Sequence, residues 1–262
     1  MYKITPLRYF LEFSYKGTAY HGWQRQPNAS TVQQQMEDAL STLLGKETTV
    51  QGAGRTDTGV HAKQMFAHVD LTISSDAVKQ LAHRLNKFLP PDIAIIDIHP
   101  VEADAHARFD AISRSYAYHL VQHKHPFAHE FAYAFTISLD WDTMNAAAKL
   151  LLNHTNFKCF SRSKTDVKTY DCKVTEAYWE QSDSEWIFHI SANRFLRNMV
   201  RAIVGTLLDV GIGKSSLGDF QAILKSEDRT KAGSSAPAHG LFLTQVQYLS
   251  LIHISEPTRP TP

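Results

Sequence analysis

Two cysteines, Cys159 and Cys172, are all that the 262-residue chain contains. They are too few for a disulfide framework and lack the spacing of a metal-binding motif, so we interpret both as reduced thiols. No apolar run approaches the ~20 residues that a membrane span requires. The N-terminal residues, Met1 to Pro6, lack the apolar stretch of a secretory signal. These absences favour a cytoplasmic protein.

The sequence also lacks an excess of either charge. Its 27 Lys and Arg residues against 26 Asp and Glu residues give a formal net charge of +1. This balance does not indicate a nucleic-acid binder, yet it does not exclude one, because phosphate contacts require a local basic surface rather than a basic total. A content of 43% hydrophobic and 20% charged residues is typical of a soluble globular protein. The length suits two domains of about 100 to 150 residues.

Hydrophobic periodicity predicts the same order of elements in both halves of the chain, namely strand, helix, strand, strand, helix, strand. In the first half the predicted strands lie near residues 7–15, 48–51, 65–71 and 93–98, and the helices at 30–44 and 75–88. In the second half the strands lie near 116–120, 173–179, 186–191 and 241–248, and the helices near 144–152, 196–210 and 217–224. Ser30 is the predicted cap of the first helix, with Gln33 completing a capping box.

This order is the ferredoxin-like plan. We therefore predict an α+β protein of two ferredoxin-like, RRM-like α/β sandwich subdomains, residues 1–107 and 108–248, whose sheets meet around a central cleft. Residues 249–262 do not continue the pattern and resemble an in-frame translation of a sequencing adapter. We expect this tail to be non-native or disordered and to pack against nothing, in which case the native C-terminus is missing.

The segment from Ala53 to Ala62 reads Ala-Gly-Arg-Thr-Asp-Thr-Gly-Val-His-Ala. Its single carboxylate, Asp57, lies between Gly54 and Gly59, whose conformational freedom suits a tight loop that presents an acid to a ligand. From spacing alone, a turn-forming Asp is the more frequent outcome. Residues 20–27 crowd aromatic, amide and guanidinium groups that could stack on bases and hold phosphates, or could simply pack a loop.

Three segments that are far apart in the sequence are informative in combination: the Asp57 loop, Arg114 to Tyr118, and Asn193 to Arg201. In combination they resemble the TruA family of tRNA pseudouridine synthases. The match spans residues 7–248 and also includes the Gly17 turn, Gly22-Trp23-Gln24 and Ala236-Pro237-Ala238-His239-Gly240-Leu241. Lys16 departs from the family pattern, which usually has an acid before the glycine of that turn, and Ser235 stands where a Thr is usual.

The resemblance implies the pseudouridine synthase fold and an isomerisation without cofactor or metal. In that reaction the uracil of a tRNA uridine is detached from C1′ of its ribose, rotated and rejoined through C5. Asp57 would act in ionised form, as a nucleophile or as a base toward the sugar. The family assigns to Arg201 the cation that keeps this carboxylate charged, and to Tyr116 the aromatic ring that packs on the target base. It further implies a homodimer and a target at positions 38 to 40 of the tRNA anticodon stem-loop.

The sequence also predicts residues that contact the substrate, in addition to the catalytic residues Asp57, Tyr116 and Arg201. Arg55 is expected to hold a phosphate or the flipped nucleotide, because a guanidinium does not deprotonate in a protein. The predicted substrate-binding residues are Arg55, Thr56, Gly59, Val60, His61, Gln24, Arg25 and Arg114. Further RNA contacts are expected from Lys63, Arg162, Lys164, Arg194 and Arg197, so that binding should fall steeply with salt.

Other interpretations of the same residues carry less weight. The histidines at positions 119, 123, 125 and 129 fit no zinc template and indicate a surface loop. We interpret His61 as a structural hydrogen-bonding residue rather than an acid–base partner of Asp57. The alternative function is a catalytically inactive RNA-binding protein with tandem RRM-like units, although no RNP1-like run is present. A hydrolase is a distant third, because no second carboxylate or metal cluster is placed to activate water.

Overall fold

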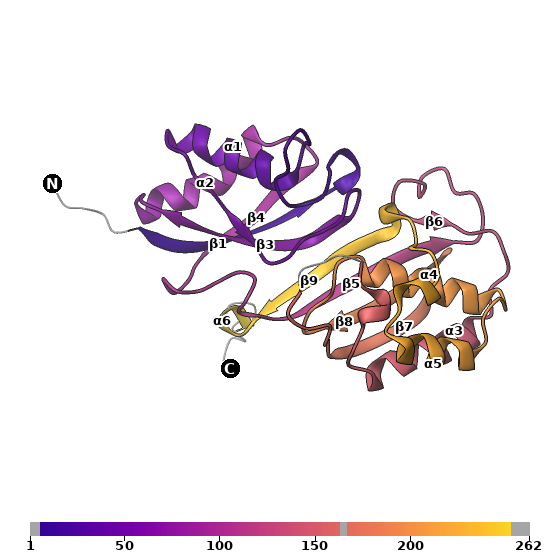
Figure 1. Ribbon diagram of the computed structural model, residues 1–262. Helices are drawn as coiled ribbons and strands as arrows, with labels where there is room; N and C mark the ends of the chain where they lie inside the picture. Colours follow the sequence, from indigo (N-terminus) through magenta and orange to yellow (C-terminus); the bar gives the residue numbers. More distant parts are fainter. Residues whose placement is uncertain (1–5, 163–166, 253–262) are drawn as a thin grey trace, which may run out of the picture.

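The computed structural model describes residues 6–162 and 167–252 of the chain. In these residues a nine-stranded mixed sheet runs through both halves of the molecule (Figure 1). The strands of the first half are β1 (Leu7–Tyr15), β2 (Gln51–Gly52), β3 (His61–Leu71) and β4 (Ile93–Pro100). Those of the second half are β5 (Ala111–Val121), β6 (Tyr133–Ala134), β7 (Val174–Ser182), β8 (Glu185–Ala192) and β9 (Leu241–Tyr248).

The strand order is β4-β1-β3-β9-β5-β8-β7, with β2 paired to β3 and β6 paired to β5. The two halves are joined where β3 and β9 pair in parallel, through His61 opposite Phe242 and Ala62 opposite Leu243. The mixed helix-and-sheet class predicted from the sequence is confirmed, with both halves contributing to a single sheet. The division at residue 107 stays a prediction.

The helices cover each half of the sheet separately. Helices α1 (Val32–Leu44) and α2 (Ser75–Phe88) lie over the strands of the first half, while α3 (Trp141–Leu150), α4 (Met199–Gly211) and α5 (Leu217–Ser226) lie over those of the second (Figure 1). Helix α1 buries Val32, Met36 and Leu40 completely and is stopped by Gly45, as the sequence predicted; Gly45 has a left-handed φ of 67°.

Two local predictions for the first half are wrong. Thr31, not Ser30, caps α1, because its hydroxyl accepts a hydrogen bond from the Gln34 amide while the Ser30 carbonyl accepts from the His21 amide. The predicted strand at residues 48–51 is instead the two-residue β2, Gln51–Gly52. A backbone contact within the loop before α1 therefore selected which of two adjacent hydroxyls caps the helix.

Two buried apolar clusters correspond to the two halves. One includes Phe13, Met36 and Leu40, and the other includes Tyr118, Phe188 and Ile203. Strand β9 contributes to both, with Leu241 in the second cluster and Leu243, Val246 and Tyr248 in the first. Tyr116 packs against both clusters, and Val60, which follows the Asp57 loop, is buried in the second. The Asp57 loop is thus anchored between the two halves.

The described residues extend into the segment that follows β9. Residues Leu249–Ile252 form the short helix α6, and Leu251 packs against the first cluster, so the expectation that the tail contacts nothing is wrong for Leu251. Residues 253–262, on which the rest of that expectation falls, lie outside the described residues. Within 6–162 and 167–252, no helix is both long enough and apolar enough to cross a membrane. Cys159 and Cys172 are buried free thiols, as predicted.

Candidate active site

The loop that carries Asp57 is fixed from several sides. The Thr56 hydroxyl forms a buried 2.8 Å hydrogen bond with the Tyr15 hydroxyl, and the Thr56 carbonyl accepts from the Trp23 amide at 3.4 Å. The Val60 amide donates to the Asp57 carbonyl at 3.2 Å and closes the turn. Thr56 and Val60, both predicted to bind substrate, therefore have structural partners that hold the Asp57 backbone in place.

Glycines allow this loop to close, although not all of those the sequence suggested. Gly59 has a φ of 78°, a left-handed conformation that favours glycine. Gly22 has a φ of 87° and lies so close that a Cβ there would overlap the Thr56 carbonyl oxygen. Gly54, in contrast, has no left-handed φ, and a Cβ there would meet nothing within 4 Å. The conformational argument thus holds for Gly59 and is wrong for Gly54.

Asp57 meets Arg201, which α4 contributes from the other half of the chain. The Arg201 Nη1 donates to Asp57 Oδ2 at 3.3 Å, with 24% of the Asp57 side chain and 21% of the Arg201 side chain exposed. The Arg201 Nε donates to the Ala236 carbonyl at 2.7 Å. The Ala236 carbonyl fixes the guanidinium, which places its positive charge against the Asp57 carboxylate. The predicted pairing of these two residues is present in the structure.

Tyr116 lies on β5, between Ile190 of β8 and Leu243 of β9. Its ring packs edge-on against Phe195, with 5.1 Å between the centroids. Burial raises the pKa of Tyr116 to about 12, and the nearby negative charge of Asp57 acts in the same direction. No hydrogen-bond partner of its hydroxyl occurs among the described residues. The structure thus brings a neutral tyrosine hydroxyl into the electrostatic range of Asp57.

His61 has a structural environment, as the sequence indicated. Its Nδ1 accepts from the Gly17 amide at 3.0 Å, which leaves Nε2 protonated to donate to the His239 carbonyl at 3.1 Å. The ring stacks on Phe242 with 4.6 Å between centroids. Burial lowers the pKa of His61. Both ring nitrogens are therefore engaged within the protein, at the place where β3 and β9 pair.

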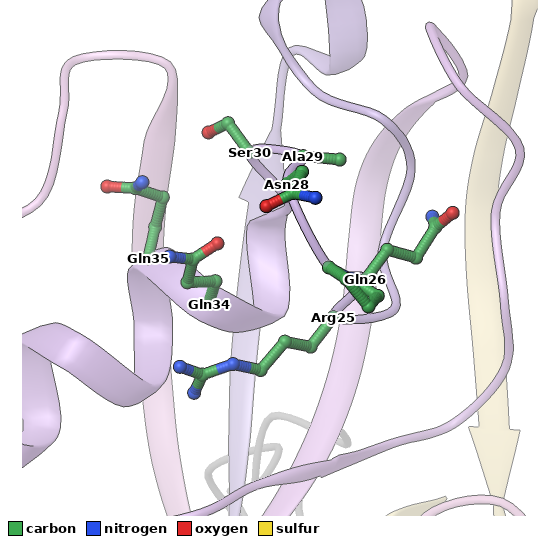
Figure 2. A pocket seen from close by; sticks show the side chains of 8 residues that line it. Arg25, Gln26, Asn28, Ala29, Ser30, Gln34 and Gln35 are labelled. Atoms are coloured by element: carbon green, nitrogen blue, oxygen red, sulfur yellow. The ribbon is translucent and has the colours of Figure 1, made fainter.

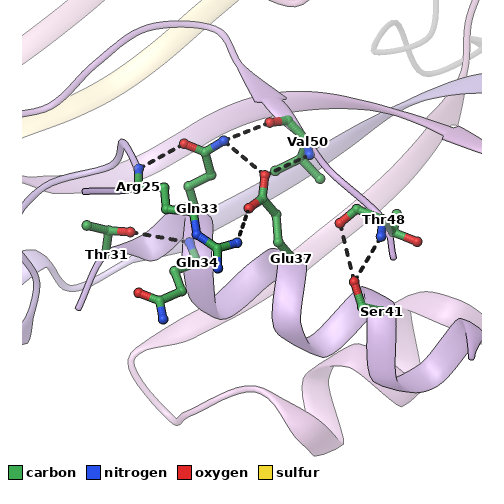
Figure 3. A network of polar contacts seen from close by, with 8 residues as sticks. All are labelled: Arg25, Thr31, Gln33, Gln34, Glu37, Ser41, Thr48 and Val50. Carbon is green, nitrogen blue, oxygen red and sulfur yellow. Dashed lines mark hydrogen bonds and ion pairs between the residues drawn. The ribbon is translucent and has the colours of Figure 1, made fainter. Parts of the chain in front are cut away.

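Arg25 is bound to the protein in a polar network at the start of α1 (Figure 3). Its Nη1 donates at 3.0 Å to Glu37, whose side chain is only 6% exposed. The Gln33 amide group donates to Glu37 and to the Val50 carbonyl, and the Val50 amide also donates to Glu37. The sequence analysis did not identify this buried carboxylate. The available signal was that Glu37 directly follows Met36, a member of the apolar stripe of α1.

A hollow of about 480 Å³ opens beside this network (Figure 2). Polar side chains surround it, and its lining residues are Arg25, Gln26, Pro27, Asn28, Ala29, Ser30, Gln34 and Gln35. Gln24, another predicted substrate contact, is exposed. It directly precedes Arg25, which lines this hollow. Glu37 already accepts from the guanidinium of Arg25, and the Gln33 side-chain oxygen accepts from the Arg25 backbone amide, so RNA would have to compete with Glu37 for the guanidinium.

The remaining predicted RNA contacts are distributed unevenly. Arg55, Arg162 and Arg197 are exposed, and Arg194 is half-buried. Lys63 is exposed and lies over the Phe242 ring, 5.3 Å from its centroid. Lys164 lies outside the described residues. Over the described ranges, no group of three or more His, Cys, Asp or Glu residues could hold a metal ion.

Arg114 has partners that the sequence did not indicate. Its guanidinium donates to four backbone carbonyls, those of Ala111 (2.8 Å), Asn193 (2.9 Å), Ala53 (3.0 Å) and Arg108 (2.6 Å). These bonds tie the start of the Asp57 loop to β5 and to the segment before α4. They give Arg114 a positioning role, and the predicted contact with substrate stays a prediction.

Comparison with known proteins gives one consistent result. A protein-family model described as tRNA pseudouridine synthase matches residues 13–110 and 147–249, which include Asp57 and Arg201. The chain is 53% identical to tRNA pseudouridine synthase A of Porphyromonas gingivalis over 93% of this chain and 98% of that protein. It is 50% identical to the protein of the same name from Bacteroides thetaiotaomicron, over 92% and 90% of the two chains. It is 38% identical to the protein of that name from Bacillus subtilis, over 90% of this chain and 96% of that protein.

Proposed function

The chain belongs to the tRNA pseudouridine synthase family, and from this premise we propose that Asp57 is the carboxylate on which its isomerisation of tRNA uridine to pseudouridine depends. The observation that carries the proposal is the 3.3 Å contact between Asp57 Oδ2 and Arg201 Nη1, which joins the two halves of the chain. A protein that only binds RNA has no need of a partly buried carboxylate paired with a dedicated cation. The structure contains that arrangement next to a tyrosine.

The chemistry assigns a distinct task to each of the three side chains. Asp57 acts as an anion, either adding to the base or ribose or taking a proton from the sugar. Arg201 pairs with that anion and orients it, because the Nε of Arg201 is held by the Ala236 carbonyl. Tyr116 carries its proton at neutral pH, since burial raises its pKa to about 12. Its hydroxyl is therefore a proton donor near C5, and its ring is a surface for the base.

The target uridine must leave its stack before it can reach Asp57, which costs a few kcal/mol. We assign Arg55 to this step, because it lies two residues before Asp57, is exposed, and has no carboxylate partner among the described residues. The finer substrate assignment is positions 38 to 40 of the anticodon stem-loop, as the family resemblance implies. With it we propose a cytoplasmic homodimer, and two ferredoxin-like subdomains with Asp57 in the cleft between them.

The decisive experiment incubates an unmodified tRNA transcript with the wild type and with Asp57→Asn, and then maps pseudouridine at single-nucleotide resolution. The near-isosteric variant should bind the transcript and convert no uridine. Asp38→Asn is the matched control, because Asp38 is exposed on α1, and it should convert like the wild type. Residual turnover by Asp57→Asn would remove Asp57 from the mechanism. A wild type that binds tRNA without converting it would instead support the inactive RNA-binding alternative.

A further inference from the structure

One guanidinium gathers three arginine-bearing segments of the chain. Arg114 donates to the carbonyls of Ala53, Arg108 and Asn193. Ala53 lies two residues before Arg55, and Asn193 directly precedes Arg194. The bonds of Arg114 therefore hold together the backbones that carry Arg55, Arg108 and Arg194, three residues that are far apart in the sequence.

A fourth arginine completes the group. The pKa of Arg55 is lowered by its partial burial and then by the positive charges of Arg108 and Arg197, which lie close enough to repel it. We call Arg55, Arg108, Arg194 and Arg197 the arginine cluster. Its side chains come from the Asp57 loop, from the connection between β4 and β5, and from the segment that leads into α4.

The arginine cluster lacks the carboxylate partners that three other arginines of the described residues have. Arg8, Arg25 and Arg201 each form an ion pair with a carboxylate. Among the described residues, none of the four cluster arginines does so. The Arg108 guanidinium lies over the ring of Phe109, 5.7 Å from its centroid. Like charges held together without an acid raise the free energy of the folded protein, and a bound anion would lower it.

We propose that the arginine cluster binds phosphodiester groups of the RNA strand that carries the target uridine, with Arg108 as one of its ligands and Arg114 as the residue that assembles it. Phosphodiesters fit because the planar guanidinium fork matches phosphate oxygens and because several are needed to engage four cations. The position fits as well, since Arg55 is two residues from Asp57. Phosphate contacts fix the register of an RNA strand, and a flipped nucleotide requires the strand to be held on both of its sides. The inference rests on the proposed function.

The test measures the affinity of an unmodified tRNA transcript at several salt concentrations for the wild type and for Arg108→Gln. Each phosphate contact contributes about 0.7 to 0.9 to the slope of log affinity against log salt. We expect Arg108→Gln to reduce the slope by about that amount and Arg108→Lys, which keeps the charge, to restore most of it. Arg108 is exposed and its side chain donates no hydrogen bond within the described residues, so both variants should fold.

Arg84→Gln is the matched control. Arg84 is an exposed arginine of α2 whose Nη2 donates to the Leu43 carbonyl. Leu43 lies near the C-terminal end of α1, whereas Gly22, the neighbour of Thr56, contacts the first residue of that helix. At 1.5 Å per residue the two ends of α1 are about 18 Å apart. Arg84→Gln should therefore leave the salt slope unchanged.

The role of Arg114 has to be tested with a measurement that a simple loss of stability would not change. In an Arg114→Met background, the change of slope caused by Arg108→Gln should be smaller than in the wild type, because Arg108 is already displaced. Equal changes of slope in both backgrounds would overturn the assembling role of Arg114. An unchanged slope for Arg108→Gln, or an Arg108→Lys variant with the slope of Arg108→Gln, would overturn the phosphate site. These slopes do not depend on turnover, so they remain interpretable if Asp57→Asn fails its own test.

Discussion

Arg201 and Ala236 form two hydrogen bonds, and each residue donates one of them. The Arg201 Nε donates to the Ala236 carbonyl at 2.7 Å, and the Ala236 amide donates to the Arg201 carbonyl at 2.9 Å. The guanidinium that faces Asp57 is thus oriented before substrate arrives. Preorganised charges of this kind act without reorganisation during the reaction.

We predict that Arg201→Lys loses most of its single-turnover rate, by about 10² to 10³, while binding tRNA nearly as well as the wild type. Lysine keeps the charge, but a single ammonium cannot contact the Ala236 carbonyl and Asp57 in the same fixed geometry. Arg8→Lys is the control, because Arg8 also pairs with an aspartate, Asp70, through two 2.8 Å bonds and lies on β1. A lysine variant at 201 with wild-type rate would show that orientation is unimportant.

We predict that Tyr116→Phe lowers the rate of conversion by about 10² without lowering the melting temperature. The hydroxyl has no hydrogen-bond partner among the described residues, so its removal leaves no buried group unsatisfied. Since burial raises the pKa of Tyr116 to about 12, the hydroxyl stays protonated through the neutral range and acts as a donor. The pH profile of the wild type should accordingly contain no step from Tyr116 below about pH 11. A Phe variant with full activity would reduce Tyr116 to a packing residue.

We predict that Gly22→Ala destabilises the fold by about 1 to 3 kcal/mol, whereas Gly54→Ala changes stability by less than about 0.5 kcal/mol. Gly22 combines a φ of 87° with close approach to the Thr56 carbonyl, and Gly54 has neither constraint. Urea denaturation of both variants measures the difference. Equal stability of the two would mean that the Asp57 loop is not fixed through Gly22.

The sequence predicted correctly those features that depend on residues close together in the chain. The span of α2, Ser75–Phe88, follows directly from its periodicity and its closing prolines. The pairing of Asp57 with Arg201 came from motif resemblance, because no local pattern relates residues 144 positions apart. The choice of Thr31 over Ser30 as a cap could not be predicted, since both hydroxyls are suitable and a contact with His21 decides between them.

Arg114 shows most clearly where sequence reasoning ends. Its predicted substrate contact came from the resemblance of the segment from Arg114 to Tyr118 to the family motif. Its four carbonyl partners belong to residues 53, 108, 111 and 193, and only the sheet brings them together. Backbone carbonyls leave no side-chain signature, so neither the role of Arg114 nor the presence of Arg108 near Arg55 was visible in advance.

A final prediction concerns the pair between Glu12 and His99 on β1 and β4. The His99 Nε2 lies 2.9 Å from Glu12 Oε2, and their side chains are 13% and 16% exposed. The hydrogen bond with Glu12 raises the pKa of His99, and the bond with His99 lowers the pKa of Glu12. A histidine with a raised pKa stabilises the folded state fully below its unfolded value, about 6.5, and loses that contribution as pH rises through the folded value.

His99→Gln should therefore destabilise the protein more at about pH 6 than at about pH 9, because only the lower pH keeps the charged pair. The comparison with the wild type is essential, since burial lowers the pKa of His61 and of His68, and those histidines stabilise the fold in the opposite direction as pH rises. Urea denaturation of both proteins at the two pH values measures the difference. A destabilisation that is equal at both, or larger at the higher pH, would mean that His99 is not charged in the folded protein and that its contact with Glu12 is a neutral hydrogen bond.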